Sequence, residues 1–307
     1  MVAFLKERGH YVRAVDIDNV KFPERRVWRD QANEVRSYDL RDFEQALEAV
    51  DGMDHIFNFS ADMGGVGYFS EQNYTPYLSN TRMDLNMVEA CVKAGVSRMF
   101  FSSSACAYPI HLQETEGETP LLAEDQLLPA NADQMYGWEK LMMILLAPHA
   151  PLDLRIGILN TVFGEGQEGT GPRAKFPPTI VHKVIESSRT GEPIEIWGNG
   201  QQTRTFLYIE DALEKMYEVM TTEEYWGPVN IAADEIVTVK QCADWLCEIA
   251  GIVPNYRYRL DKPSGVLARG VDNTKFYEYY TYRNRFTTRE GFARLYGYRS
   301  HTHETRA

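Results

Sequence analysis

The sequence has 307 residues, of which 44% are hydrophobic and 25% are charged, a composition typical of one large or two smaller globular domains. Its formal net charge is −12, which argues against a nucleic-acid partner, because such proteins normally present a basic surface. No apolar run approaches the roughly 18 residues that a membrane-spanning helix needs, so we expect no membrane partner.

Four cysteines are present, and none of them forms a Cys-x-x-Cys pair: Cys91, Cys106, Cys242 and Cys247. This spacing argues against a zinc site and against a disulfide framework. We therefore expect reduced thiols, no bound metal and a cytoplasmic location.

The chain begins with a predicted helix at 2–8 and a predicted strand at 11–15 that ends in Asp16. In a dinucleotide-binding fold, an acidic side chain at the end of the second strand binds the adenosine ribose. Asp16 fits this position and would favour NAD over NADP, whose extra phosphate it would repel. The first strand and its glycine-rich turn would then precede Met1, so we expect a truncated sequence rather than a loss of normal cofactor binding.

A glycine-rich segment follows the strand predicted at 55–59, and residues 60–67 read Ser-Ala-Asp-Met-Gly-Gly-Val-Gly. Three glycines in four positions let a backbone approach a ligand closely, so Gly65 and Gly67 are candidate ligand-binding positions. The alternative is a loop that is merely flexible.

A serine cluster lies at the carboxyl end of the buried strand predicted at 96–101, where ligands bind in open α/β sheets. Ser104 and Cys106 belong to this segment. Tyr136 and Lys140 are four residues apart on a predicted apolar helix, so they share one face. A positively charged lysine beside a phenol stabilises the phenolate, and we expect it to lower the pKa of Tyr136 from about 10.

The remaining predicted elements surround a glycine- and proline-rich loop at 164–178. They are helices at 42–50 and 80–94, a strand at 155–160, a helix at 179–188, a strand and turn at 194–200, a strand at 202–206, a helix from 208, a strand at 228–232, a helix at 238–250, a loop at 264–273 and a short helix at 288–296. We expect the last residues, 301–307, to form a polar tail.

Ser104, Tyr136 and Lys140 together resemble the active-site pattern of the short-chain dehydrogenase/reductase superfamily, which transfers hydride with a nicotinamide cofactor. By this resemblance, Ser104 hydrogen-bonds the reacting oxygen and Tyr136 moves its proton. Lys140 would hold the nicotinamide ribose and tune Tyr136, which also places both residues beside NAD. Asp39, in an Asp-Leu-Arg sequence that matches the superfamily, would face the adenine, and Ala61 would also contact the cofactor.

The resemblance implies an α/β fold, with a Rossmann-type doubly wound parallel sheet and a smaller, discontinuous α/β substrate-binding lobe. We expect the NAD-binding domain at 1–165 and 205–232, and the sugar-nucleotide-binding lobe at 166–204 and 233–300.

Four segments narrow the resemblance to the family of GDP-mannose 3,5-epimerases: residues 61–67, 103–109, 172–177 and 197–206. The discriminating residues are Cys106 and Lys175, which the resemblance makes the acid/base pair. The implied reaction converts GDP-mannose to GDP-L-galactose. Transient oxidation at carbon 4 makes the protons on carbons 3 and 5 acidic, and reduction at carbon 4 completes the cycle without net redox change.

The resemblance also assigns residues to the nucleotide-sugar substrate, with arginine and lysine suited to its diphosphate. They are Gly65, Gly67, Ser104, Asn160, Lys183, Gln202, Arg204 and Arg269. The family commonly dimerises through two helices beside the active site, so we expect a homodimer formed by the helices at 80–94 and 136–146.

Two alternatives stay open. The first is another NAD-dependent sugar-nucleotide 4-epimerase, dehydratase or decarboxylase, although a 4,6-dehydratase usually carries an Asp-Glu pair where Ala105 and Cys106 stand here. The second is a non-catalytic binding protein that has lost normal NAD binding. The retained catalytic pattern opposes this second alternative.

Overall fold

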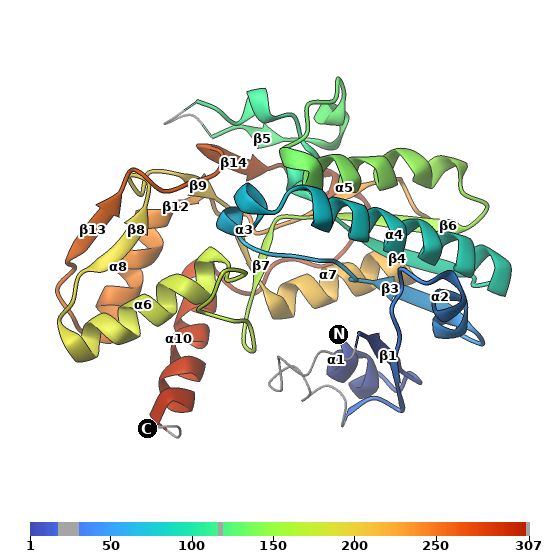
Figure 1. Cartoon of the computed structure of the whole chain (residues 1–307), viewed down its shortest axis with the longest axis horizontal. Helices are drawn as coiled ribbons and strands as arrows, with labels where there is room; N and C mark the ends of the chain where they lie inside the picture. The colour runs from blue at the N-terminus through green and yellow to red at the C-terminus, as the bar shows by residue number, and fades with distance from the viewer. Residues whose placement is uncertain (18–30, 116–118, 305–307) are drawn as a thin grey trace.

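The sheet that organises the molecule has four parallel strands in the order β11–β6–β4–β3 (Figure 1). The computed structural model describes residues 1–17, 31–115 and 119–304. The strands are β3 (His55–Asn58), β4 (Arg98–Ser104), β6 (Asp153–Leu159) and β11 (Val229–Ile231). β4 pairs with β6 along its whole length, with Ser104 opposite Leu159 at the end. Parallel pairing brings the carboxyl ends of these strands to one edge, which fixes where Ser104 lies.

Helices cover both faces of this sheet, and the side chains of β4 alternate between them. The covering helices are α2 (Phe43–Val50), α4 (Tyr74–Ala94), α5 (Gln134–Leu146) and α7 (Ile209–Thr221). Met99 and Phe101 pack in the group that includes α4 and α5, whereas Phe100 packs in the group that includes α7. Because both faces are buried, the middle of the strand, Met99 to Phe101, is apolar on both sides. This layering confirms the expected doubly wound α/β fold.

A separate parallel pair of strands lies near the N-terminus. It consists of β1 (Arg13–Asp16) and β2 (Glu34–Ser37), preceded by α1 (Val2–Glu7). The Arg13 guanidinium donates to the Glu34 carboxylate at 2.6 Å and to the Asp51 carbonyl at 2.6 Å. These contacts tie both strands to the end of α2. The helix and strand expected at the start of the chain are confirmed, with Asp16 as the last residue of β1.

The smaller lobe packs around a second group of buried side chains. Its strands are β5 (Leu121–Leu122), β8 (Ile194–Trp197), β9 (Thr203–Arg204), β12 (Val237–Thr238), β13 (Tyr256–Arg259) and β14 (Ala268–Val271), and its helices are α6 (Phe176–Thr190), α8 (Val239–Ala250) and α10 (Thr288–Glu304). The strands form one sheet in the order β12–β9–β14–β5 and a second one from β13 and β8.

The remaining elements of the described residues are α3 (Val66–Glu71), β7 (Thr161–Phe163), β10 (Phe206–Tyr208), α9 (Thr274–Tyr279) and the 3-10 turns Ala105–Ala107, Ile110–Leu112, Glu124–Leu127 and Ala147–His149. The expected residue limits of the two domains stay predictions.

Two expected elements in the middle of the chain differ from the structure. α4 begins at Tyr74 instead of residue 80, because Pro76 is tolerated in the first turn of a helix. The strand expected at 202–206 is two short strands, since β9 pairs with β12 and β14 whereas β10 pairs with β7.

Two expectations near the C-terminus are also wrong. The loop expected at 264–273 contains β14, whose backbone pairs with β5 and β9, partners that are distant in sequence. The last helix runs to Glu304 instead of ending at residue 296. The expected tail is therefore helical as far as Glu304, and residues 305–307 lie outside the described residues.

All four cysteines are free thiols, of which only Cys106 is not fully buried. Across residues 1–17, 31–115 and 119–304, no helix combines the length and apolar character needed to cross a membrane. In the same ranges, no group of three or more His, Cys, Asp or Glu side chains is placed to hold a metal ion.

A cluster of three buried charged side chains joins α4 to α5. Lys140 is 2% exposed, and Asp84 and Glu139 are fully buried. The Lys140 ammonium lies 2.9 Å from Glu139 Oε1 and 3.7 Å from Asp84 Oδ2. Two carboxyl groups therefore share one ammonium, and burial raises the pKa of Asp84 to about 7, with Glu139 adding to the rise and Lys140 opposing it.

Because of this cluster, we expect the free energy of unfolding to depend on pH. An Asp84→Asn variant tests this dependence. The native pKa of about 7 exceeds the ordinary value of 3.8, so the native state binds the proton more tightly between these values. The free energy of unfolding therefore falls as pH rises through this window. Because Asn does not titrate, we expect the free energy of unfolding of Asp84→Asn to fall less than that of wild type between pH 5 and pH 8, by up to about 3 kcal/mol, with a slope of about 1.4 kcal/mol per pH unit below pH 7.

Urea unfolding at several pH values between 5 and 8 measures this difference. The matched control is Glu89→Gln, which removes an exposed carboxylate from the same helix and should follow the wild-type pH dependence. Equal pH dependence in wild type and Asp84→Asn would contradict the raised pKa.

Candidate active site

Ser104 and Tyr136 lie close together because α5 packs directly against the 3-10 turn that follows β4. Gly137 makes this approach possible, since a Cβ atom there would collide with the Cys106 carbonyl oxygen. The Asp133 backbone N–H donates to the same carbonyl at 2.9 Å. The Ser104 hydroxyl is close enough to the Tyr136 phenol to lower its pKa, although burial has the larger and opposite effect. The glycine beside Tyr136 is therefore a packing requirement of the site.

Lys140 lies one helical turn after Tyr136, with its ammonium 5.6 Å from the centre of the Tyr136 ring. Burial alone would lower the pKa of Lys140, but Asp84 and Glu139 raise it above its ordinary value. Lys140 is therefore positively charged near neutral pH. Burial raises the pKa of Tyr136, and Lys140 offsets only part of the rise. The expected lowering of the Tyr136 pKa is wrong in this structure, because desolvation of the phenolate outweighs the attraction of the lysine.

Cys106 lies in the 3-10 turn after β4, and its Sγ is 3.1 Å from Nη1 of Arg269. Its backbone N–H donates to Ser104 Oγ at 3.2 Å. The Arg269 guanidinium also donates to Asp133 at 2.8 Å and to Gln113. A fixed positive charge therefore lies beside the sulfur. The phosphate-binding role expected for Arg269 stays a prediction, and the structure shows this side chain engaged with the active-site segment instead.

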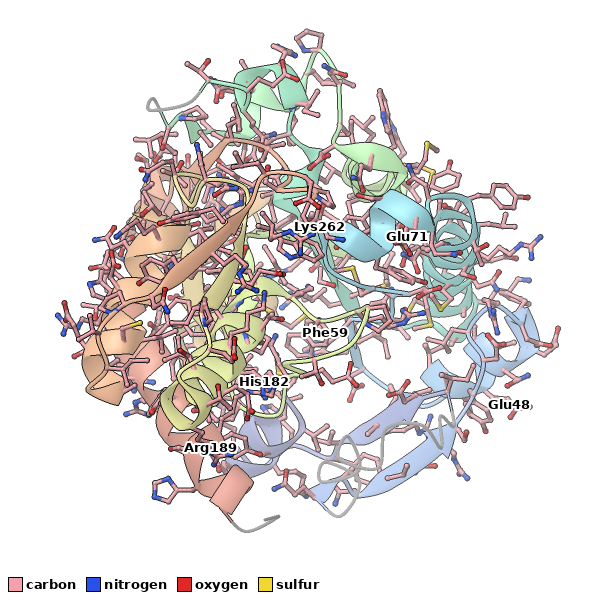
Figure 2. The ribbon with its side chains drawn as sticks, turned by 60° about the vertical axis from the view of Figure 1, so that its left-hand side comes forward. Glu48, Phe59, Glu71, His182, Arg189 and Lys262 are labelled. Atoms are coloured by element: carbon pink, nitrogen blue, oxygen red, sulfur yellow. The ribbon has the colours of Figure 1, made fainter. Side chains whose placement is uncertain are left out.

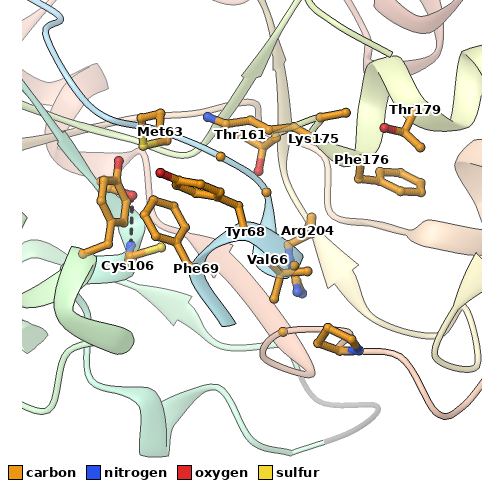
Figure 3. A pocket seen from close by; sticks show the side chains of 18 of the residues that line it. Met63, Val66, Tyr68, Phe69, Cys106, Thr161, Lys175, Phe176, Thr179 and Arg204 are labelled. Carbon is orange, nitrogen blue, oxygen red and sulfur yellow. Dashed lines mark hydrogen bonds between the residues drawn. The ribbon is translucent and has the colours of Figure 1, made fainter. Parts of the chain in front are cut away.

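Lys175 is the N-terminal cap residue of α6, and its side chain enters the same cavity. Figure 3 shows Cys106 at the left of the view and the Lys175 side chain extending across its upper middle, above Tyr68. Burial lowers the pKa of Lys175, Cys106 opposes this effect and Lys140 adds to it. A lysine with a lowered pKa has a larger neutral fraction, which is what a general base requires.

These residues surround one cavity of about 870 Å³ at the carboxyl edge of the main sheet. Every residue predicted to be catalytic or to bind substrate lines this cavity. These residues are Gly65, Gly67, Ser104, Cys106, Tyr136, Lys140, Asn160, Lys175, Lys183, Gln202, Arg204 and Arg269. The structure therefore brings the whole predicted set together, from segments that are far apart in sequence.

Several polar groups of this cavity lack complementary protein partners. Asn160 Nδ2 and Gln202 Oε1 are buried without a hydrogen-bond partner among the described residues. Arg204 donates to the backbone carbonyls of Thr203, Ser264 and Val266. Burial lowers the pKa of Arg204 and Arg269 adds to this effect, so the guanidinium is short of negative charge. Asn160 Nδ2 and Arg204 therefore fit an anionic group, whereas Gln202 Oε1, an acceptor, fits a hydroxyl group of a ligand.

Lys183 differs from the other predicted substrate residues. Its ammonium donates to the Glu195 carbonyl at 2.9 Å and lies 3.7 Å from the Glu195 carboxylate. Part of its positive charge is therefore already balanced, and its predicted contact with substrate stays a prediction.

A second cavity, also of about 870 Å³, lies between β1 and β3. Asp16, Asp39 and Ala61, the residues expected to contact NAD, all line it. Phe59, Ala61 and Met63 line both cavities, and Phe59 lies near the centre of the molecule in Figure 2. The two cavities therefore meet beside the catalytic residues, as an elongated dinucleotide requires.

The acidic groups at this end of the site differ in how they are engaged. Asp16 is exposed and accepts a hydrogen bond from the backbone N–H of Ile17 at 2.8 Å, so most of its carboxylate is open. Asp39 binds the Arg41 guanidinium through both oxygens. The Asp16 carboxylate is therefore available to bind the ribose, whereas the Asp39 carboxylate is already bound to Arg41 and is less available to the adenine.

Sequence reasoning missed four side chains that position the site. They are Asp84 and Glu139 beside Lys140, and Gln113 and Asp133 on Arg269. Glu139 is the neighbour of Lys140, and Asp133 is the N-terminal cap residue of α5. The sequence position of Glu139 and Asp133 beside the predicted helix could have indicated their roles. Nothing in the sequence near Asp84 or Gln113 indicates that they contact Lys140 or Arg269.

Comparisons with known proteins agree with this geometry. Residues 1–232 match the NAD dependent epimerase/dehydratase family. The chain is 31% identical over 296 residues to GDP-mannose 3,5-epimerase of Arabidopsis thaliana, covering 95% of this chain and 76% of the relative. It is 32% identical over 280 residues to GDP-mannose 3,5-epimerase 1 of Oryza sativa subsp. japonica, covering 88% of this chain and 70% of the relative.

Solved structures share the fold at lower sequence identity. A UDP-glucose 4-epimerase from Thermotoga maritima, crystallised with UDP-glucose, has a TM-score of 0.83 and 21% identity, covering 98% of this chain and 94% of that one. A double mutant of dTDP-glucose 4,6-dehydratase from Streptomyces venezuelae, crystallised with NAD, also has a TM-score of 0.83, at 17% identity and with 99% and 94% covered. The chain therefore belongs to the NAD dependent epimerase/dehydratase family and is an enzyme whose cofactor is NAD.

Proposed function

We propose that the enzyme converts GDP-mannose to GDP-L-galactose by inverting carbons 3 and 5 of the sugar. The observation that carries this proposal is the presence of Cys106 and Lys175 in the same cavity as Ser104 and Tyr136. The plant relatives named GDP-mannose 3,5-epimerase support the choice of substrate.

The first task of the protein is to move a proton at the carbon 4 oxygen. Ser104 holds this oxygen, and Tyr136 takes its proton and later returns it. Tyr136 takes this proton as the phenolate and becomes a phenol, so the positive charge of Lys140 stabilises the phenolate that must be present before the transfer. NAD, when bound, would supply the hydride acceptor for oxidation at carbon 4 and the hydride donor for its later reduction. Tyr136 and Lys140 would contact its nicotinamide end, with Ala61 next along the cavity and Asp16 and Asp39 at its adenosine end.

The second task is proton exchange at carbons 3 and 5, whose protons become acidic beside a carbon 4 carbonyl. Inversion needs a base on one face of the sugar and an acid on the other. Lys175, with its lowered pKa, is suited to remove a proton from one face, and Cys106, in the same cavity, is suited to supply one to the other. Arg269 stabilises the sulfur after it has given up its proton.

The diphosphate needs cations and hydrogen-bond donors. Arg204 and Asn160 Nδ2 offer these in the cavity, whereas the Gln202 amide, whose Nε2 donates to the Trp197 carbonyl, leaves Oε1 to accept from a sugar hydroxyl. A bound diphosphate would balance the charge that makes Arg204 and Arg269 repel each other.

We also propose a homodimer and a cytoplasmic location. α4 exposes Leu85 and Val92, and α5 exposes Trp138 and Leu145, each 37–47% exposed. Each pair is seven residues apart and so lies on one face of its helix. Apolar groups exposed on two adjacent helices support association of two copies. The free thiols support a reducing compartment.

Deuterium exchange tests the proposed reaction. In deuterated water with GDP-mannose and NAD, we expect the wild-type enzyme to incorporate deuterium at both carbon 3 and carbon 5. Lys175→Met and Cys106→Ser should lose exchange by about 100-fold or more, because each removes a proton-transfer group. Both should still oxidise carbon 4. Mass spectrometry and NMR of the recovered sugar measure the exchange at each carbon.

Lys240→Met is the matched control, since this lysine pairs with Asp244 on α8 and does not line the cavity. A wild-type enzyme that exchanges neither carbon would reject the 3,5-epimerase and favour another sugar-nucleotide reaction. Normal exchange in both active-site variants would remove the acid/base roles of Cys106 and Lys175.

The dimer is tested by charge on the exposed helix face. We expect light scattering to find a dimer for wild type and a monomer for the double variant Trp138→Glu, Leu145→Glu, because two carboxylates would be buried on association. Val253→Glu is the control, since Val253 is 88% exposed but lies in another part of the molecule. A wild-type monomer, or a variant that stays dimeric, would contradict this interface.

A further inference from the structure

The loop that carries Lys175 is fastened to the cofactor side of the site by Arg173. Its Nη1 donates to Asp62 and, at 2.9 Å, to the Met63 carbonyl. Its Nη2 donates to the Tyr68 hydroxyl at 2.9 Å, and the guanidinium lies 4.2 Å from the centre of the Tyr68 ring. The Tyr68 hydroxyl in turn donates to Asp62 at 3.0 Å. We call Asp62, Tyr68 and Arg173 the latch.

The Asp62 end of the latch is held by a rigid element. The backbone N–H of Asp62 donates to the Asn80 side chain at 2.6 Å, and Asn80 is fully buried on α4. α4 packs against α5, which carries Tyr136. The latch therefore connects the Lys175 loop to the same helices that position the phenol.

Glycines let the two segments of the latch fit together. A Cβ atom on Gly65 would lie 2.5 Å from the carbonyl oxygen of Ala174, the residue between Arg173 and Lys175. A Cβ atom on Gly64 would lie 2.5 Å from the Tyr68 Cβ. Neither contact is possible with a side chain, so these glycines serve the loop contact as well as any approach to substrate.

The loop that leads to Lys175 turns at two glycines. Gly166 and Gly171 adopt positive φ angles of 79° and 88°, so the backbone turns at points where other residues are strained. Arg173 lines the second cavity with Asp62, whereas Tyr68 and Lys175 line the first. The latch thus lies in the wall between the two cavities, two residues from the proposed base.

We propose that the latch positions Lys175 for proton exchange and is not needed for oxidation at carbon 4. The proposal rests on the proposed function, because it assigns Asp62 and Arg173 to one half of that reaction. They act through Lys175 and are positioning residues. Their loss should therefore resemble the loss of Lys175, in a weaker form.

Two activity measurements separate these steps in Asp62→Asn and Arg173→Met. One is deuterium incorporation at each carbon, and the other is the absorbance of reduced nicotinamide when GDP-mannose is added. We expect exchange to fall about tenfold or more at the carbon that Lys175→Met affects, since a small displacement of a catalytic group has effects of this size. Reduction of the nicotinamide should change less than about threefold.

Limited trypsin digestion supplies a readout without substrate. Asp62→Asn and Tyr68→Phe should be cleaved after Arg173 or Lys175 several times faster than wild type, while their melting temperatures stay within about 3 °C of it. Asp244→Asn is the control, because Asp244 forms a similar cluster with Lys240 and Tyr256 away from both cavities.

The possible outcomes are distinct. A parallel loss of exchange and of nicotinamide reduction in Asp62→Asn would overturn the positioning role, and so would unchanged trypsin cleavage. A wild-type enzyme that reduces the nicotinamide but exchanges neither carbon would instead overturn the proposed function, and with it the role given to Lys175.

Discussion

The attraction of Lys140 to Asp84 and Glu139 is the interaction on which the rest of the site depends. A lysine that is 2% exposed would shed its proton if it stood alone, because desolvation penalises the charged form. Two buried carboxyl groups reverse this tendency and keep the ammonium charged. Since Asp84 belongs to α4 and Lys140 to α5, the same attraction also holds together the helices that present Tyr136. Breaking it would leave uncompensated buried charge.

Three cations around the catalytic cavity differ in the negative charge available to each. Lys140 has two carboxyl groups and keeps its proton, whereas burial pushes Lys175 towards its neutral form. Arg269 is paired with Asp133 and stays charged beside Cys106. When the surroundings give two similar groups different pKa values, the group with the higher pKa stays charged and the group with the lower pKa is suited to accept and release protons. The distribution of carboxylates therefore separates a lysine that keeps its proton from one that loses its proton more readily.

Periodicity and local spacing predicted the parts of the site that depend on one element. The carboxyl end of β4 placed Ser104, and helical spacing placed Tyr136 above Lys140. Contacts between distant segments could not be predicted in this way: Asp84 reaches Lys140 across 56 residues, and β14 exists because β9 and β5 pair with it. The pKa of Tyr136 was predicted in the wrong direction for the same reason, since burial is a property of the folded molecule.

Backbone contacts at glycines set how closely the catalytic segments approach one another. At Gly137 the backbone of α5 rests on the Cys106 carbonyl, and at Gly65 the segment after β3 rests on the Ala174 carbonyl. Side-chain rotamers adjust by ångströms, but a backbone resting on a carbonyl oxygen has almost no freedom to do so. The separation of the Cys106 and Lys175 segments from the phenol is therefore determined by main-chain contacts. This explains why a site built from three distant segments requires glycine, which has no side chain, at the points of contact.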